Sequence, residues 1–313
     1  MSESVTAFAP ASIGNIAVGF DMLGLALAGV GDRVSARRTD GAGVTIANVY
    51  GLDGEPHPYL STDPDHNTAS IAAKALWHDY GDGGGIELSV YKGVPLQSGM
   101  GSSAASAVAA VVAVNALTGT PLPAEQLLTY ALAGEQYASG GLHADNVAPS
   151  LLGGMVFCPQ VLLPDVIRLP TPQGVSAALL HPELQVNTAH ARRKLAQGYS
   201  MEQWLSQQGY LGGFIAACAS GDIDMLGKTL KDVIIEPQRK SAVSCFDVVK
   251  EAAERRGALG FSLSGSGPSL FALCRDNDAK NIAIAMEQAC RSVGIECQSY
   301  VSSMSAPGAR IED

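Results

Sequence analysis

Residues 95–105, PLQSGMGSSAA, combine glycines, two adjacent serines and the start of an apolar, alanine-rich segment. Glycine lets a backbone approach a ligand closely, and the first N–H groups of a helix lack helical partners and lie at the positive end of its dipole. These features favour an anion, above all a phosphate group. The alternative is that Ser102 and Ser103 only cap a helix. The glycines before the serines and the alanine-rich segment behind them favour phosphate binding.

The elements expected around this loop would hold its two ends. Residues 86–91 alternate as a strand does, and residues 102–117 are apolar on nearly every side, which predicts a buried helix. Residues 10–24 and the segment SGGLHADN at residues 139–146 are predicted to be loops that face a ligand, with a strand at residues 151–159. We therefore expect an α+β protein.

Composition restricts the classes of function that need to be considered. The 313 residues are 47% hydrophobic and 16% charged, which indicates two packed domains; prolines near residue 162 predict the domains 1–162 and 163–313. A formal net charge of −10 argues against a nucleic-acid partner. The six cysteines form no CxxC pair, and no secretory leader pattern is present, so we expect a cytoplasmic protein. No apolar run reaches about 18 residues, so we expect no membrane contact.

A Gly-Lys-Thr triplet at residues 227–229 looks like the end of the familiar phosphate-binding loop. The preceding Gly221 is one residue too far away, and the triplet lies within a helical pattern instead of following a strand. We interpret this match as chance.

Three segments together resemble the GHMP kinases, whose members phosphorylate galactose, homoserine, mevalonate and phosphomevalonate. These segments are PASIGN at residues 10–15, the PxxSGxGSSA loop at residues 95–104 and SGSGP at residues 264–268, so the resemblance covers the whole chain. NIAVGFD at residues 15–21 and HADNVAPS at residues 143–150 are similar to the members that act on homoserine. Gln97 departs from the pattern, because the family usually has glycine there.

The resemblance implies a fold and a nucleotide site. The expected fold has two α+β domains, the first with a left-handed βαβ unit and the second ferredoxin-like. ATP is the expected co-substrate, with Mg²⁺ held by Ser103 and Glu135. Without the family, Glu135 would be interpreted as a solvated surface carboxylate. The residues expected to bind ATP are Pro95, Gln97, Ser98, Gly99, Met100, Gly101, Ser102 and Ser103.

The resemblance also implies an acceptor site for an amino acid. Asn15 and Asp21 match residues that hold an amino group, and Arg192 and Arg239 match residues that clamp a carboxylate, although Arg193 leaves the first arginine ambiguous. Each arginine by itself would be interpreted as an exposed charge. The acceptor hydroxyl is expected beside His143 and Asn146 of the SGGLHADN segment. Gly265 of the third segment completes the set of residues expected to bind the acceptor.

The expected reaction is transfer of the ATP γ-phosphate to the hydroxyl of L-homoserine, a step of threonine biosynthesis. The candidate catalytic residues are Ser103, Glu135, Asp145 and Asn146. Some relatives use an aspartate in the corresponding loop as the general base, which makes Asp145 a candidate. In the members that act on homoserine, Asn146 matches the residue that faces the substrate, and an amide cannot accept the proton, so the resemblance favours direct attack by the hydroxyl. Two alternatives stay open: another small alcohol such as mevalonate, or a non-catalytic ligand sensor. The sequence leaves the oligomeric state open, a homodimer included.

Overall fold

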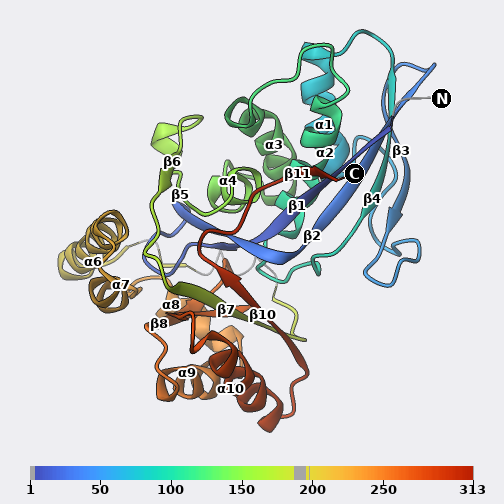
Figure 1. Ribbon diagram of the computed structural model, residues 1–313. Coiled ribbons are helices and arrows are strands. Elements are labelled where there is room, and N and C mark those ends of the chain that lie inside the picture. Colours follow the sequence, from blue (N-terminus) through green and yellow to red (C-terminus); the bar gives the residue numbers. More distant parts are fainter. Residues whose placement is uncertain (1–3, 187–194, 197, 313) are drawn as a thin grey trace.

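The protein contains two β-sheets with helices packed on their outer faces (Figure 1). The computed structural model describes residues 4–186, 195–196 and 198–312. In chain order the elements are β1 (Ser4–Gly14), β2 (Leu23–Thr39), β3 (Gly43–Tyr50), α1 (Thr68–Tyr80), β4 (Gly85–Tyr91), α2 (Ser102–Asn115), α3 (Ala124–Ser139), α4 (Ala144–Leu152), β5 (Met155–Phe157), β6 (Ile167–Leu169), β7 (Val175–Pro182), α6 (Met201–Ser220), α7 (Ile223–Thr229), α8 (Glu236–Arg239), α9 (Phe246–Arg255), β8 (Gly260–Leu263), β9 (Leu270–Arg275), α10 (Ala279–Ser292), β10 (Cys297–Ser303) and β11 (Arg310–Glu312).

The first sheet has the order β11-β1-β2-β4-β3, with β5 paired to β2 and β6 paired to β5. Its neighbours are antiparallel except β3 and β4, which run parallel and are joined through α1. This connection is the expected βαβ unit, and its hand stays a prediction. Helices α1, α2, α3 and α4 pack against one another and cover one face of the sheet, and β11 brings the C-terminal end back to β1 (Figure 1).

The second sheet has the order β10-β7-β9-β8, and all its neighbours are antiparallel. In chain order this is the arrangement 4-1-3-2 of a ferredoxin-like βαββαβ unit, as expected. One face packs on α9 and α10 through Phe246, Val249 and Ile282. The opposite face shares a core with the first sheet, in which Leu179 and Phe271 meet Ile13 and Leu25. The α+β fold is therefore confirmed. The boundary at residue 162 stays a prediction.

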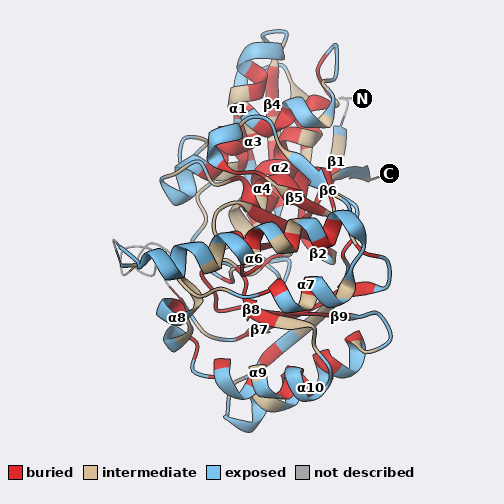
Figure 2. Ribbon diagram, turned by 90° about the vertical axis from the view of Figure 1, so that its left-hand side faces the viewer, coloured by how far each residue is buried: buried red, intermediate tan, exposed pale blue. Residues whose placement is uncertain are grey.

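Helix α2 is buried along its length, as its apolar composition predicts. Residues 104–111 are all buried, and the helix contacts β1, β2, α1 and α3 (Figure 2). Small alanine side chains allow this close approach of helices and strands. In the part of the chain that is described, no helix is long and apolar enough to cross a membrane.

Two loop predictions were wrong in part. The segment SGGLHADN ends inside a helix, because α4 begins at Ala144, and the following strand is only Met155–Phe157. Pro149 suggests a helix break, since it removes the hydrogen bond to the carbonyl of Asp145. That carbonyl lies against Gly24 of β2, where an added Cβ would be 1.7 Å from its oxygen. Glycine on the neighbouring strand thus makes room for a helix that contains proline.

The ligand-facing loop near the start is also shorter than residues 10–24. Strand β1 continues to Gly14 and β2 begins at Leu23, so only the residues between them form a loop. Pro10 does not end the strand because the pairing of β1 with β2 shifts register between Pro10 and Ala11. Proline has no N–H to donate, and an irregularity in the ladder is where a strand tolerates it.

Candidate active site

A cavity of about 540 Å³ lies where the loop after β1, the loop before α2, the start of α4 and the segment after β8 meet. Most of the residues predicted for the site line it: Asn15, Asp21, Gln97, Ser98, Gly99, Gly101, Ser102, Ser103, Glu135, His143, Asp145, Asn146, Arg239 and Gly265. Pro95 lines a smaller neighbouring cleft, and Met100 is fully buried. Arg192 lies outside the described residues.

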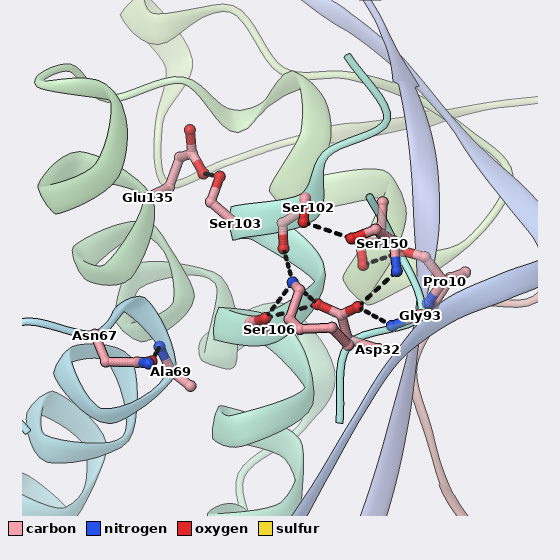
Figure 3. Close-up of polar contacts among 12 residues, drawn as sticks. Pro10, Asp32, Asn67, Ala69, Gly93, Ser102, Ser103, Ser106, Glu135 and Ser150 are labelled. Carbon is pink, nitrogen blue, oxygen red and sulfur yellow. Dashed lines mark hydrogen bonds and ion pairs between the residues drawn. The ribbon is translucent and has the colours of Figure 1, made fainter. Parts of the chain in front are cut away.

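The serines at the start of α2 do not cap it. Gly101 is the N-cap residue, in the left-handed conformation, and no side chain accepts a hydrogen bond there. Ser102 Oγ instead donates to the Val94 carbonyl over 2.9 Å, and Ser103 Oγ donates to Glu135 Oε2 over 2.7 Å (Figure 3). Among the described residues, no side chain is seen to cap the first N–H groups of α2. An uncapped helix start that lines a cavity is suited to bind an anion.

The loop before α2 is held between the two other glycine-rich segments. Ser12 N donates to the Met100 carbonyl over 3.0 Å, and Ser264 Oγ donates to the Gly99 carbonyl over 2.6 Å. At Gly101 an added Cβ would lie 2.4 Å from Ser12 Oγ, so only glycine fits there. Gln97 has a positive φ of 53°, a backbone conformation that glycine adopts without a steric penalty. The three segments therefore form one continuous wall.

The side chains of Ser103 and Glu135 bring together two oxygen atoms that could bind a metal ion. Glu135 on α3 is 7% exposed, and its burial raises the pKa of the carboxyl group to about 7 against the lowering effect of the hydrogen bonds from Ser103 and Ser139. Magnesium prefers oxygen ligands and is commonly bound by one or two carboxylates together with substrate phosphates. This pair fits such an ion. Within the described ranges no group of three or more His, Cys, Asp or Glu side chains is arranged to hold a metal ion.

The opposite part of the cavity gathers the groups predicted to recognise an amino acid. Asn15 Nδ2 donates to the Gly265 carbonyl over 2.8 Å, and Arg239 Nη1 donates to the same carbonyl over 3.1 Å. The Arg239 guanidinium lies 5.0 Å from the centre of the Phe20 ring and the residue is 6% exposed. Asp21 Oδ2 is 3.7 Å from His143 Nδ1. An acidic and a basic side chain thus line one cavity from different elements.

Asp145 and Asn146 lie side by side at the start of α4 but differ in surroundings. The Asp145 carboxylate accepts a hydrogen bond from the backbone N–H of Asn15, and burial, together with the charges of Asp21 and Glu135, raises its pKa to about 7. Its Oδ2 would lie 2.7 Å from a Cβ at Gly14, so the carboxylate lies against the main chain of the first loop. Asn146 Oδ1 instead accepts a hydrogen bond from Ser12 Oγ over 3.0 Å. That bond orients the Asn146 amide.

Sequence reasoning missed a buried ion pair under the loop, between Lys92 and Asp32. The two residues are separated by 60 positions, and no local pattern indicates that they meet. The only sequence signal is that Lys92 directly precedes the glycine-rich loop. The apolar residues Leu60, Val90 and Leu96, which also line the cavity, were missed as well.

This fold and this site define a class of small-molecule kinase. Residues 67–154 match the model of the GHMP kinases N terminal domain, and residues 214–292 match the model of the GHMP kinases C terminal domain. The chain belongs to the GHMP kinases.

Individual members of the family are similar to this chain over nearly its whole length. The chain is 41% identical over 306 residues to the homoserine kinase of Xanthomonas campestris pv. campestris (strain B100), covering 97% of this chain and 93% of that protein. The crystal structure of homoserine kinase from Cytophaga hutchinsonii matches with a TM-score of 0.94 and 40% identity, over 100% of this chain and 98% of that one. L. major mevalonate kinase in complex with R-mevalonate matches with a TM-score of 0.66 and 15% identity, over 97% and 98% of the two chains, and this likeness concerns the fold alone.

Proposed function

We propose that the protein transfers the γ-phosphoryl group of ATP to the side-chain hydroxyl of L-homoserine, forming O-phospho-L-homoserine for threonine biosynthesis. The observation that carries the proposal is a single cavity that joins the uncapped start of α2 and the Ser103–Glu135 pair to Asp21 and Arg239. A kinase for an amino acid needs such a combination, because the phosphate groups and the acceptor must be held together.

The nucleotide is assigned to the part of the cavity around the start of α2. Its phosphates would accept hydrogen bonds from the N–H groups of the loop and of Ser102 and Ser103, at the positive end of the helix dipole. Leu60 and Leu96, two apolar residues of the cavity lining, would suit a nucleobase. Bound beside Ser103 and Glu135, Mg²⁺ would neutralise charge on the phosphates. The protein residues hold and orient the nucleotide.

The acceptor is assigned to the part of the cavity around Asp21 and Arg239. Asp21 would pair with the ammonium group of homoserine, and the Arg239 fork would bind its carboxylate. Asn15 would help hold the ammonium group, and its bond to the Gly265 carbonyl fixes the orientation of its amide. Arg192 is proposed as a second carboxylate ligand on the family pattern alone. Mevalonate has no ammonium group, so Asp21 favours an amino-acid acceptor.

Direct attack by the acceptor hydroxyl is the proposed chemistry. The hydroxyl oxygen bonds to the γ-phosphorus, the bond from that phosphorus to the β–γ bridging oxygen breaks, and the hydroxyl proton passes to phosphate or water. Asn146 and His143 would orient the hydroxyl. Asp145 is the alternative base, and its pKa of about 7 would suit that role. The contact of its carboxylate with the main chain of Asn15 favours a role in shaping the loop.

An acceptor screen tests this proposal. ADP release would be measured with ATP, Mg²⁺ and either homoserine, mevalonate, galactose or shikimate, and phosphorus NMR would identify the product. We expect turnover with homoserine and little with the others. Turnover with mevalonate alone would contradict the amino-acid acceptor, and ligand binding without any ADP release would favour the non-catalytic sensor. A cytoplasmic location and a homodimer stay predictions from the sequence.

A further inference from the structure

Three side chains to which no role has been assigned above form a closed network beneath the loop that precedes α2 (Figure 3), and two of them, Lys92 and Ser106, also line the cavity. Asp32 lies on β2, Lys92 follows the last residue of β4, and Ser106 lies in the second turn of α2. Lys92 Nζ contacts Asp32 Oδ2 and donates to Ser106 Oγ over 2.8 Å, while Ser106 Oγ donates to Asp32 Oδ2 over 2.6 Å. The Lys92 and Asp32 side chains are 3% and 0% exposed.

This network joins the residues before the loop to the residues after it. Asp32 Oδ1 accepts hydrogen bonds from Gly93 N over 2.8 Å and Val94 N over 3.0 Å. Lys92 Nζ donates to the Ser102 carbonyl over 2.9 Å. Ser102 Oγ then donates to the Val94 carbonyl over 2.9 Å, so the chain on one side of the loop is bonded directly to the chain on the other. Residues 95–101 are thus held at their base.

The stability gained from the Asp32–Lys92 ion pair is expected to be small, which indicates a further role for it. Removing two charges from water is costly, and a buried ion pair is often no more stabilising than apolar side chains of the same volume. Because the pair is neutral overall, it also adds little attraction for phosphate. What it does supply is directional bonding, which fixes where the loop begins and where the N–H groups of α2 point.

We propose that Asp32, Lys92 and Ser106 are positioning residues of the nucleotide site, which clamp the base of the loop so that the first turn of α2 is aimed at the phosphates. This inference rests on the proposed assignment of ATP to that part of the cavity. The clamp acts on the phosphate-binding main chain and, among the described residues, has no hydrogen bond or ion pair with those assigned to homoserine.

A double-mutant cycle separates positioning from simple stability. Asp32→Asn and Lys92→Met each leave one buried charge without its partner, so both single variants should unfold at lower denaturant concentration. The double variant contains neither charge and should regain most of that stability. The amide oxygen introduced by Asp32→Asn can still accept hydrogen bonds from the main chain, but the bond from Lys92 to the Ser102 carbonyl is lost.

The decisive readout is nucleotide affinity in the double variant, measured by titration calorimetry with ADP and Mg²⁺. Loss of a charged hydrogen bond at the clamp should weaken ADP binding by about ten- to hundredfold. The KM for homoserine should stay within about twofold of the wild type, because no acceptor contact changes. Ser106→Ala, which keeps both charges, should weaken ADP binding by about fivefold without impairing folding.

Arg255→Met is the matched control, since it removes one partner of an exposed ion pair with Glu251 on α9. It should change neither stability nor ADP affinity. A double variant that regains both stability and wild-type ADP affinity would overturn the clamp, and so would wild-type ADP affinity in Ser106→Ala. If the wild-type protein bound no ADP, the proposed kinase function would fall together with this inference.

Discussion

Replacing Glu135 by glutamine should make the protein more stable at neutral pH while it loses activity. Glu135 is 7% exposed, and its pKa is raised by burial from 4.5 to about 7. The folded protein therefore keeps this proton up to about pH 7, whereas the unfolded chain loses it near pH 4.5. Because the folded state binds more protons in this window, the free energy of unfolding of the wild type falls as pH rises through it.

The size of the effect follows from the shift. A carboxyl pKa raised from 4.5 to about 7 corresponds to about 3 kcal/mol of unfolding free energy. Glutamine keeps the shape of the side chain and can still accept the hydrogen bond from Ser103, but it has no proton to lose. Relative to the wild type, Glu135→Gln should gain little stability at about pH 4.5 and about 3 kcal/mol at about pH 8.

The assay is urea unfolding of both proteins between about pH 4.5 and about pH 8, combined with turnover at saturating ATP, Mg²⁺ and homoserine. Mutating a residue that only hydrogen-bonds to a metal ligand typically lowers activity by about 10- to 100-fold. Loss of a direct metal ligand should therefore lower kcat by at least about a hundredfold. Glu125→Gln is the control, because Glu125 is an exposed carboxylate in the first turn of the same helix. A stability difference that does not change with pH would refute the electrostatic argument, and full activity would refute the metal assignment.

Three other substitutions test the acceptor site and the packing. Arg239→Leu should raise the KM for homoserine strongly, since truncating one partner of a buried charge pair costs about 2 to 5 kcal/mol; a collapse of ATP affinity at unchanged homoserine KM would instead place Arg239 at the phosphates. Asp21→Asn keeps the side-chain shape and removes the charge, so homoserine turnover should be largely lost, and unchanged kinetics would favour an acceptor without an ammonium group. Ala105→Leu should lower the free energy of unfolding by about 1 to 3 kcal/mol through overpacking, because Ala105 is fully buried, and an unchanged unfolding midpoint would contradict this.

Local sequence patterns predict an element well only where the element's own residues decide its position. The helix after the glycine-rich loop was predicted at residues 102–117 and lies at Ser102–Asn115, because its apolar residues on all sides allow only a buried position. Helix α4 was not predicted; it contains Pro149, a residue that disfavours helix locally, and the space for the freed Asp145 carbonyl comes from Gly24 on another strand. That compensation is tertiary and has no signature near the proline.

The sequence by itself determined the position of the glycine- and serine-rich loop, the buried helix behind it and the family, since glycine, serine and alanine act through conformation and volume over a few neighbouring residues. Only the tertiary structure decided which distant groups meet. Ser103 contacts Glu135 across 32 positions, and Asp32 contacts Lys92 across 60. The pKa of Glu135 likewise depends on burial by segments far away in the chain, and desolvation arises only when those segments pack together.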